Sequence, residues 1–275
     1  MSEFFVILEY AFFRNALLSA LLTSVLAAIV GTYVVSRKIV FISGGITHAS
    51  FGGIGMAYYF GLNPFLGAAI FAVLTSTGIE WISKQGKIRE DSAIAILWSL
   101  GMATGIIFVF MTPGYTPDLM SFLFGNILTV TVSELWLLAI FCCFTALFFW
   151  IFYRPLLNTA FDPEFPKIVG IPVSIYRYTM AIIVGLAIVI SIRSVGIILV
   201  LSLFTIPQIT AMLFTRDFAR VMPLAAFWGG LGSVMGLFVS YALNIPSGAT
   251  IICFLTLQFL VVKGVVMLLN GLKRG

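Results

Sequence analysis

The sequence predicts an all-α membrane protein with about eight or nine transmembrane helices, folded as a single domain over residues 1–275. Hydrophobic residues make up 61% of the chain and charged residues only 9%, and the mean hydropathy is +1.15. This composition is typical of polytopic membrane proteins and excludes the soluble globular classes. The apolar residues also gather in runs of roughly 20, the length that an α-helix needs to cross the hydrocarbon core of a bilayer.

Nine apolar segments are expected to form the spans, and several are short or rich in glycine, as broken or re-entrant helices are. Their expected bounds are 15–35, 39–60, 65–82, 92–112, 132–152, 175–192, 196–214, 222–242 and 249–270. Residues 1–14 carry Glu3 and Glu9 among aromatic side chains and predict a short interfacial helix. The first span lacks a small-x-small cleavage site, so we do not expect a cleavable signal.

The basic residues predict the orientation of the chain. One side of the membrane receives 12 of the 15, and we take it as cytoplasmic: Arg37, Lys38, Lys84, Lys87, Arg89, Arg154, Lys167, Arg177, Arg216, Arg220, Lys273 and Arg274. The C-terminus is then inside, and the N-terminus is outside if all nine segments cross but inside if one of them is re-entrant. Spans one to four and six to nine start from opposite sides and flank a central fifth, which is the hydropathy pattern of an inverted repeat. Gly101-x-x-x-Gly105 and Gly232-x-x-x-Gly236 predict close helix packing within the chain.

Several functional classes do not fit. The net charge of +5 does not indicate nucleic-acid binding, because the basic residues are spread over loops. The three cysteines lie in apolar segments, which favours buried thiols over a disulfide or metal site. No Walker A pattern occurs, and the lone histidine lacks partners for a catalytic set. All ten carboxylates fall in loops or near span ends, whereas ion-coupled carriers usually keep an acidic residue at depth; we therefore expect an external energy source.

The only histidine, His48, lies in the glycine-rich second span. Read as a helix from about Ile39, the chain rises roughly 14 Å to His48, near the midplane of a core about 30 Å thick. An ionisable side chain at that depth indicates a functional site. Its helical face carries glycine at i−4, i−3, i+4 and i+7, namely Gly44, Gly45, Gly52 and Gly55. Bare backbone on this face would allow a hydrated ion to come close. The alternative is that it allows a second helix to pack closely, with His48 as only a packing residue.

Residues 112–128, after the fourth span, begin with a turn-rich stretch and continue with an apolar one that is too short to cross. Phe122, Phe124 and Asn126 would form an outer gate if this stretch dips into the membrane. A loop packed over the helix bundle is the alternative.

The longest polar cytoplasmic segment, 161–172, predicts a short helix, with Asp162 as N-cap and Gly170 near its end. Apolar residues on such a helix suit a groove on a protein partner, although the helix could also lie on its own bundle. The candidate residues for this docking role are Asp162, Glu164, Phe165, Ile168 and Gly170.

Five short motifs occur in order along nearly the whole chain: 43–49 (SGGITHA), 90–94 (EDSAI), 118–128 (DLMSFLFGNIL), 161–165 (FDPEF) and 243–250 (LNIPSGAT). Together they resemble the permeases of bacterial ABC importers for zinc, manganese and iron. The resemblance implies a type II importer fold in the bacterial cytoplasmic membrane and a homodimeric pathway, or one built by a closely related pair. It also implies a cytoplasmic ATPase bound at 161–172 and an extracytoplasmic metal-binding protein. The chain would then be no enzyme and bind no cofactor: the metal is its cargo, and ATP is hydrolysed on the partner.

The resemblance has one departure, since the family usually has Asp four residues before the histidine and this chain has Gly44. His48 therefore stays the candidate metal ligand, while Gly44, Gly45, Thr47, Gly52 and Gly55 are candidates for lining the pathway. The ligand set and the identity of the metal stay open. A permease for a metal chelate and an ion-coupled carrier without an ATPase are the alternatives.

Overall fold

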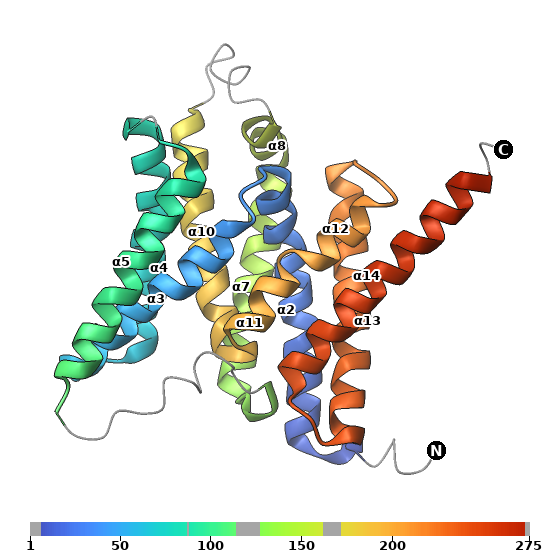
Figure 1. Ribbon diagram of the computed structural model, residues 1–275, viewed down its shortest axis with the longest axis horizontal. Coiled ribbons are helices and arrows are strands. Elements are labelled where there is room, and N and C mark those ends of the chain that lie inside the picture. The colour runs from blue at the N-terminus through green and yellow to red at the C-terminus, as the bar shows by residue number, and fades with distance from the viewer. Residues whose placement is uncertain (1–6, 87, 114–126, 162–171, 273–275) are drawn as a thin grey trace. The chain divides into compact units, whose positions relative to one another are not determined.

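The structure is a computed structural model that describes residues 7–86, 88–113, 127–161 and 172–272, and in these ranges the regular elements are helices (Figure 1). The predicted all-α class is therefore confirmed. The elements in chain order are η1 (Ile7–Glu9), α2 (Ala11–Ser36), α3 (Phe41–Tyr59), α4 (Pro64–Gly86), α5 (Glu90–Met111), η2 (Ile127–Thr129), α7 (Val132–Ile151), α8 (Tyr153–Phe161), α10 (Val173–Val195), α11 (Ile197–Leu203), α12 (Ile206–Met212), α13 (Phe218–Leu243) and α14 (Ser247–Leu272).

Each of the nine predicted apolar segments corresponds to helix in the structure. Seven helices are long and apolar enough to cross a membrane: α2, α4, α5, α7, α10, α13 and α14. The other two segments are α3, whose many Gly, Ser and Thr residues lower its hydropathy, and the pair α11–α12. The span expected at 196–214 is broken at Thr205, which has φ −131° and ψ −56°, directly before a helix turn that contains Pro207. Proline lacks the backbone N–H that a continuous helix would use there.

The predicted interfacial helix at 1–14 is described only from residue 7. Residues Ile7–Glu9 form a 3-10 turn, and residues from Ala11 onward already belong to α2. The chain divides into two compact units: Met1–Val35, Phe124–Ala146 and Ser194–Gly275 form unit 1, and Ser36–Leu123 with Leu147–Arg193 form unit 2. Unit 2 holds α3, α4 and α5 from the first predicted repeat together with α10, the first helix of the second repeat. Unit 1 holds α11–α12, α13 and α14 from the second repeat together with α2, the first helix of the first repeat.

In unit 2, α3 packs against both α4 and α5 (Figure 1). Helix α10 joins this triplet by running antiparallel to α4. At one end Lys84 Nζ lies 2.7 Å from Ser174 Oγ, and at the other the Arg193 guanidinium lies 4.9 Å from the centre of the Phe65 ring. Between them, Gly185 allows a close approach to the backbone of α4.

Unit 1 repeats this plan. Helix α12 packs against α13 and α14, as α3 packs against α4 and α5. Helix α2 runs antiparallel to α13: the Phe13 and Phe238 rings are 5.2 Å apart, Ser24 Oγ lies 3.3 Å from Ser233 Oγ, and Ala28 packs near the start of α13. The contact of α2 with α13 thus corresponds to that of α10 with α4, as the predicted inverted repeat requires.

The break between α11 and α12 is held to α2 by Gln208. This fully buried side chain donates from Nε2 to the carbonyl oxygens of Ala27, at 2.7 Å, and Leu203, at 3.1 Å. Gly31 makes room for the amide, since a Cβ atom there would lie 2.6 Å from Gln208 Nε2. A broken helix is tolerated at membrane depth only where such partners satisfy its backbone.

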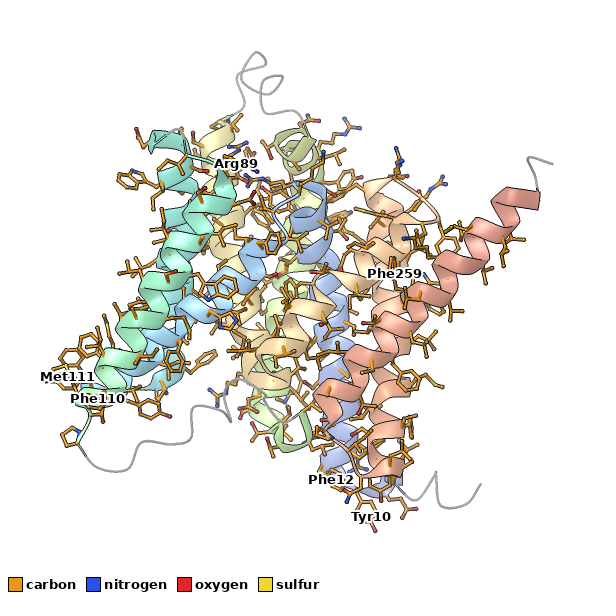
Figure 2. The ribbon with its side chains drawn as sticks, viewed as in Figure 1. Tyr10, Phe12, Arg89, Phe110, Met111 and Phe259 are labelled. Carbon is orange, nitrogen blue, oxygen red and sulfur yellow. The ribbon has the colours of Figure 1, made fainter. Side chains whose placement is uncertain are left out.

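The outer surfaces of the spans are apolar, as lipid contact requires. Figure 2 shows Phe110 and Met111 at the end of α5, where they are 91% and 52% exposed. Helix α14 carries Leu257, Leu260 and Leu268 at more than half exposure. Exposed apolar side chains on this scale would aggregate in water, and the predicted multi-pass membrane location accounts for them.

Candidate functional site

His48 lies in the middle part of α3, as the sequence predicts, and is partly buried. Its imidazole stacks on the indole of Trp98 from α5, with the ring centres 4.6 Å apart and the planes at 5°. The Nδ1 atom is buried without a hydrogen-bond partner among the described residues. The sequence analysis missed Trp98. The available signal was the spacing of Ile94, Trp98 and Gly101, which places all three on the α5 face that also carries Gly105.

The glycines on the His48 face bring α3 and α5 together. A Cβ atom at Gly45 would lie 2.5 Å from Ile94 Cγ2, and one at Gly52 would lie 2.8 Å from the carbonyl oxygen of Gly101. Gly53 approaches Gly67 of α4 in the same way. The predicted close-packing role of Gly101-x-x-x-Gly105 is confirmed, and Gly232-x-x-x-Gly236 likewise packs against Leu255 and Ile251 of α14.

This packing restricts what the glycine face can do within unit 2. Gly45, Gly52 and Gly55 contact α5 directly, and Gly44 is buried. These contacts are those of a packing groove. That any of the four lines a pathway stays a prediction.

The hydroxyl groups near His48 are satisfied by their own helix. Thr47 Oγ1 donates to the carbonyl oxygen of Ser43 at 2.5 Å, Ser50 Oγ donates to that of Ile46 at 2.7 Å, and both side chains are at most 1% exposed. Such internal bonds remove the cost of a bare hydroxyl in an apolar surrounding. Thr47 is thus engaged in α3, and its predicted place beside a pathway stays untested.

No carboxylate of the described residues forms a hydrogen bond or ion pair with His48. Among the described residues, no group of three or more His, Cys, Asp or Glu side chains could hold a metal ion. With Gly44 at the i−4 position, His48 is left as a single nitrogen donor.

Three charged residues of unit 2 meet instead at the start of α3. Arg37 lies in the turn before that helix and contacts Glu80 of α4 through Nη1, while Nη2 lies 2.6 Å from Glu90 Oε1 of α5. The Arg37 and Glu80 side chains are only 5% and 7% exposed. The attraction between opposite charges at this distance offsets much of the desolvation cost of burying each of them. The ion pairs therefore tie the beginning of α3 to both helices that flank it.

Two groups of predicted site residues lie outside the described ranges. They are the outer-gate candidates Phe122, Phe124 and Asn126, and the docking candidates Asp162, Glu164, Phe165, Ile168 and Gly170. Both assignments stay predictions.

The comparisons with known proteins cover nearly the whole chain. The ABC 3 transport family model matches residues 9–265. An uncharacterised membrane protein of Synechocystis is 37% identical over 254 residues, which are 92% of this chain and 90% of that protein. A manganese transport system membrane protein of Halalkalibacterium halodurans is 33% identical over 246 residues, 90% of this chain and 84% of that protein. The solved structure of PsaBC from Streptococcus pneumoniae in complex with a Fab superposes with a TM-score of 0.83 at 32% identity, covering 95% of this chain and 94% of that one.

Proposed function

The chain belongs to the ABC 3 transport family, and we propose that it forms the membrane pathway of an ATP-driven importer for a divalent metal ion, with manganese as the first candidate cargo. The family membership is the one that the five sequence motifs predict. The observation that carries the proposal is the likeness, over nearly the full length of both chains, to a membrane protein named for manganese transport. The reading as an ion-coupled carrier without an ATPase does not agree with this family.

His48 is the residue that we propose to meet the metal. A neutral imidazole nitrogen ligates divalent first-row metals, including manganese, zinc and iron. A site in a pathway must also release its ion, so it has to bind more weakly than a storage or structural site. A single imidazole without a neighbouring carboxylate meets that requirement. Two copies of the chain about a two-fold axis would place two such donors around one path.

The importer needs two further partners in this proposal. The sequence holds no Walker A pattern, so we assign ATP hydrolysis to a separate cytoplasmic subunit that docks at 161–172. An extracytoplasmic metal-binding protein would capture the ion and deliver it. The permease would then hold its cargo only during passage.

Uptake by the reconstituted complex tests the proposal. The chain is placed in liposomes with its ATPase and its binding protein, and manganese, zinc, free iron and siderophore-bound iron are offered in turn. We expect ATP-dependent uptake of manganese, and native mass spectrometry of the complex is expected to give two copies of the permease. Uptake of the siderophore complex alone would replace the proposal with a chelate permease. Uptake without the ATPase would replace it with an ion-coupled carrier.

A further inference from the structure

We propose that Trp98 is a positioning residue for the cargo site, and that its indole holds the plane in which the imidazole of His48 meets the metal. The inference rests on the proposed function, in which His48 contacts the transported ion. It adds a residue from α5 to a site that the sequence places on α3 alone.

The stack fixes the plane of the imidazole. Parallel rings with centres 4.6 Å apart form an offset stack, so tilting the His48 ring out of this plane would bring its edge into the indole. Helix packing holds both rings in place. Ile94, one turn before Trp98, contacts Gly45, and Gly101, one turn after it, contacts Ala49. Because α3 and α5 run in parallel here, Trp98 meets His48 between these two fixed points.

This orientation leaves one nitrogen for the ion. Nδ1 is buried and has no hydrogen-bond partner among the described residues, so it faces the protein. Nε2, in contrast, is not buried without a partner. A metal ligand must present an open lone pair, and the geometry therefore assigns that role to Nε2.

Trp98 also replaces the hydrogen-bond partner that usually holds a metal-ligating histidine in place. A ligating histidine is normally held by a hydrogen bond from its other ring nitrogen to a carboxylate or carbonyl, which fixes the ring and raises its basicity. Nδ1 of His48 has no such bond within the described residues. The flat indole restrains the ring by contact instead, and it adds no negative charge that would slow release.

The indole also favours the loaded state. A divalent ion on Nε2 draws electron density from the imidazole and gives the ring cationic character. A cation over the face of tryptophan is attracted by the ring quadrupole, and tryptophan is the strongest of the aromatic residues in this respect. The contact is therefore stronger with the ion bound than without it, which gives the site some affinity for cations in place of the missing carboxylate.

Fluorescence quenching tests the placement directly. The chain has five tryptophans, and Trp81, Trp136, Trp150 and Trp228 are changed to phenylalanine so that Trp98 is the only emitter. Co²⁺ is the probe, since this metal quenches indole emission at short range and imidazole binds it. We expect saturable quenching that manganese competes away and that His48→Ala abolishes. A matched protein that keeps only Trp136, a 66% exposed residue of α7, should show no saturable quenching.

Transport by two Trp98 variants tests the role. Trp98→Leu keeps an apolar side chain but removes the ring, and it should raise the metal concentration for half-maximal uptake by about tenfold, the lower range for lost support of a metal-ligating histidine. Trp98→Phe keeps a ring and should stay close to wild type. If Trp98 only filled space, Trp98→Leu and Trp98→Phe would not differ in this way in the metal concentration for half-maximal uptake.

The outcomes distinguish this inference from the proposed function. If wild-type complex imports metal while Trp98→Leu transports normally, or while Trp98 emission ignores Co²⁺, the inference fails and the proposed function stands. If the wild-type complex imports no metal ion, the proposed function fails, whatever the quenching shows. The quenching arm keeps Trp98 unchanged, so it decides the matter even if Trp98→Leu does not fold.

Discussion

The backbone of α3 at Gly55 approaches α5 at Gly105 so closely that a Cβ atom on Gly55 would lie 2.5 Å from the Gly105 carbonyl oxygen. Real Cβ atoms do not come this near to a carbonyl, and the blocking atom is backbone, which cannot rotate away. This contact lies two turns after His48 and belongs to the same glycine face. The position of His48 against α5 therefore depends on the absence of a side chain at Gly55.

Gly55→Ala should destabilise the protein. The added methyl group has to push α3 away from α5, and overpacking of this kind costs about 1–3 kcal/mol. Thermal unfolding in detergent measures the loss. Gly264→Ala is the matched control, because Gly264 also lies in a helix but has no atom within 4 Å of an added Cβ. If both variants melt at the same temperature, the α3–α5 contact is looser than the structure has it.

Arg37→Ala should lower the free energy of unfolding more than Arg89→Ala, which breaks an ion pair at the surface. It leaves Glu80 buried at 7% exposure without its cation, and breaking one side of a buried ion pair costs about 3–5 kcal/mol. Arg89→Ala is the control: that pair, with Asp91, is 84% and 53% exposed, and exposed pairs contribute about 0.2–1 kcal/mol. Thermal unfolding compares the two. Equal losses would mean that the Arg37 ion pairs do not hold the start of α3.

His48→Ala should cut metal uptake at least tenfold, since removing a ligand costs no less than removing the support of one, which is about 10–100-fold. Folding and basal ATP hydrolysis of the complex should not change, because the buried Nδ1 of His48 has no hydrogen-bond partner among the described residues. Radioactive manganese uptake into proteoliposomes measures the effect. Ser50→Ala, on the same helix, removes only a hydroxyl that bonds Ile46 and should transport normally. Normal uptake by His48→Ala would make the histidine a packing residue.

Gly44→Asp should restore a carboxylate four residues before His48, on the same helical face. We expect tighter manganese binding in the pathway and slower turnover, because an added negative oxygen donor favours the bound ion over its release. Isothermal titration and uptake rates give the two effects separately. Gly44→Asn has the same size without the charge and controls for the burial of this position. If Asp and Asn behave alike, the effect is steric, and the charge of the carboxylate plays no part.

Phe165→Asp should release the ATPase while the permease stays folded. A charged side chain in the middle of an apolar docking surface must be desolvated on binding, which costs more than the contact returns. Co-purification of a tagged ATPase with the variant measures the interaction, and the elution volume of the permease checks its fold. An unchanged yield of bound, stimulated ATPase would remove 161–172 from the interface.

The sequence by itself determined the helical spans, because length and apolar character are local properties that the bilayer selects. The span predicted at 132–152 ends within one residue of α7, whereas the break at Thr205, just before Pro207, was not located inside the span predicted at 196–214. The sequence also placed His48 on a glycine face, since the spacing of residues along a helix fixes which of them share a side.

Only the tertiary structure decided what covers that face. The stack of His48 on Trp98 joins α3 to α5, and the ion pairs of Arg37 reach across 43 and 53 residues to Glu80 and Glu90. Periodicity gives the direction in which a side chain points from its own helix, but it carries no information on which distant helix lies there. That choice follows from the packing of all the helices of a unit at once, and here the glycines set it by letting two backbones meet where any larger side chain would hold them apart.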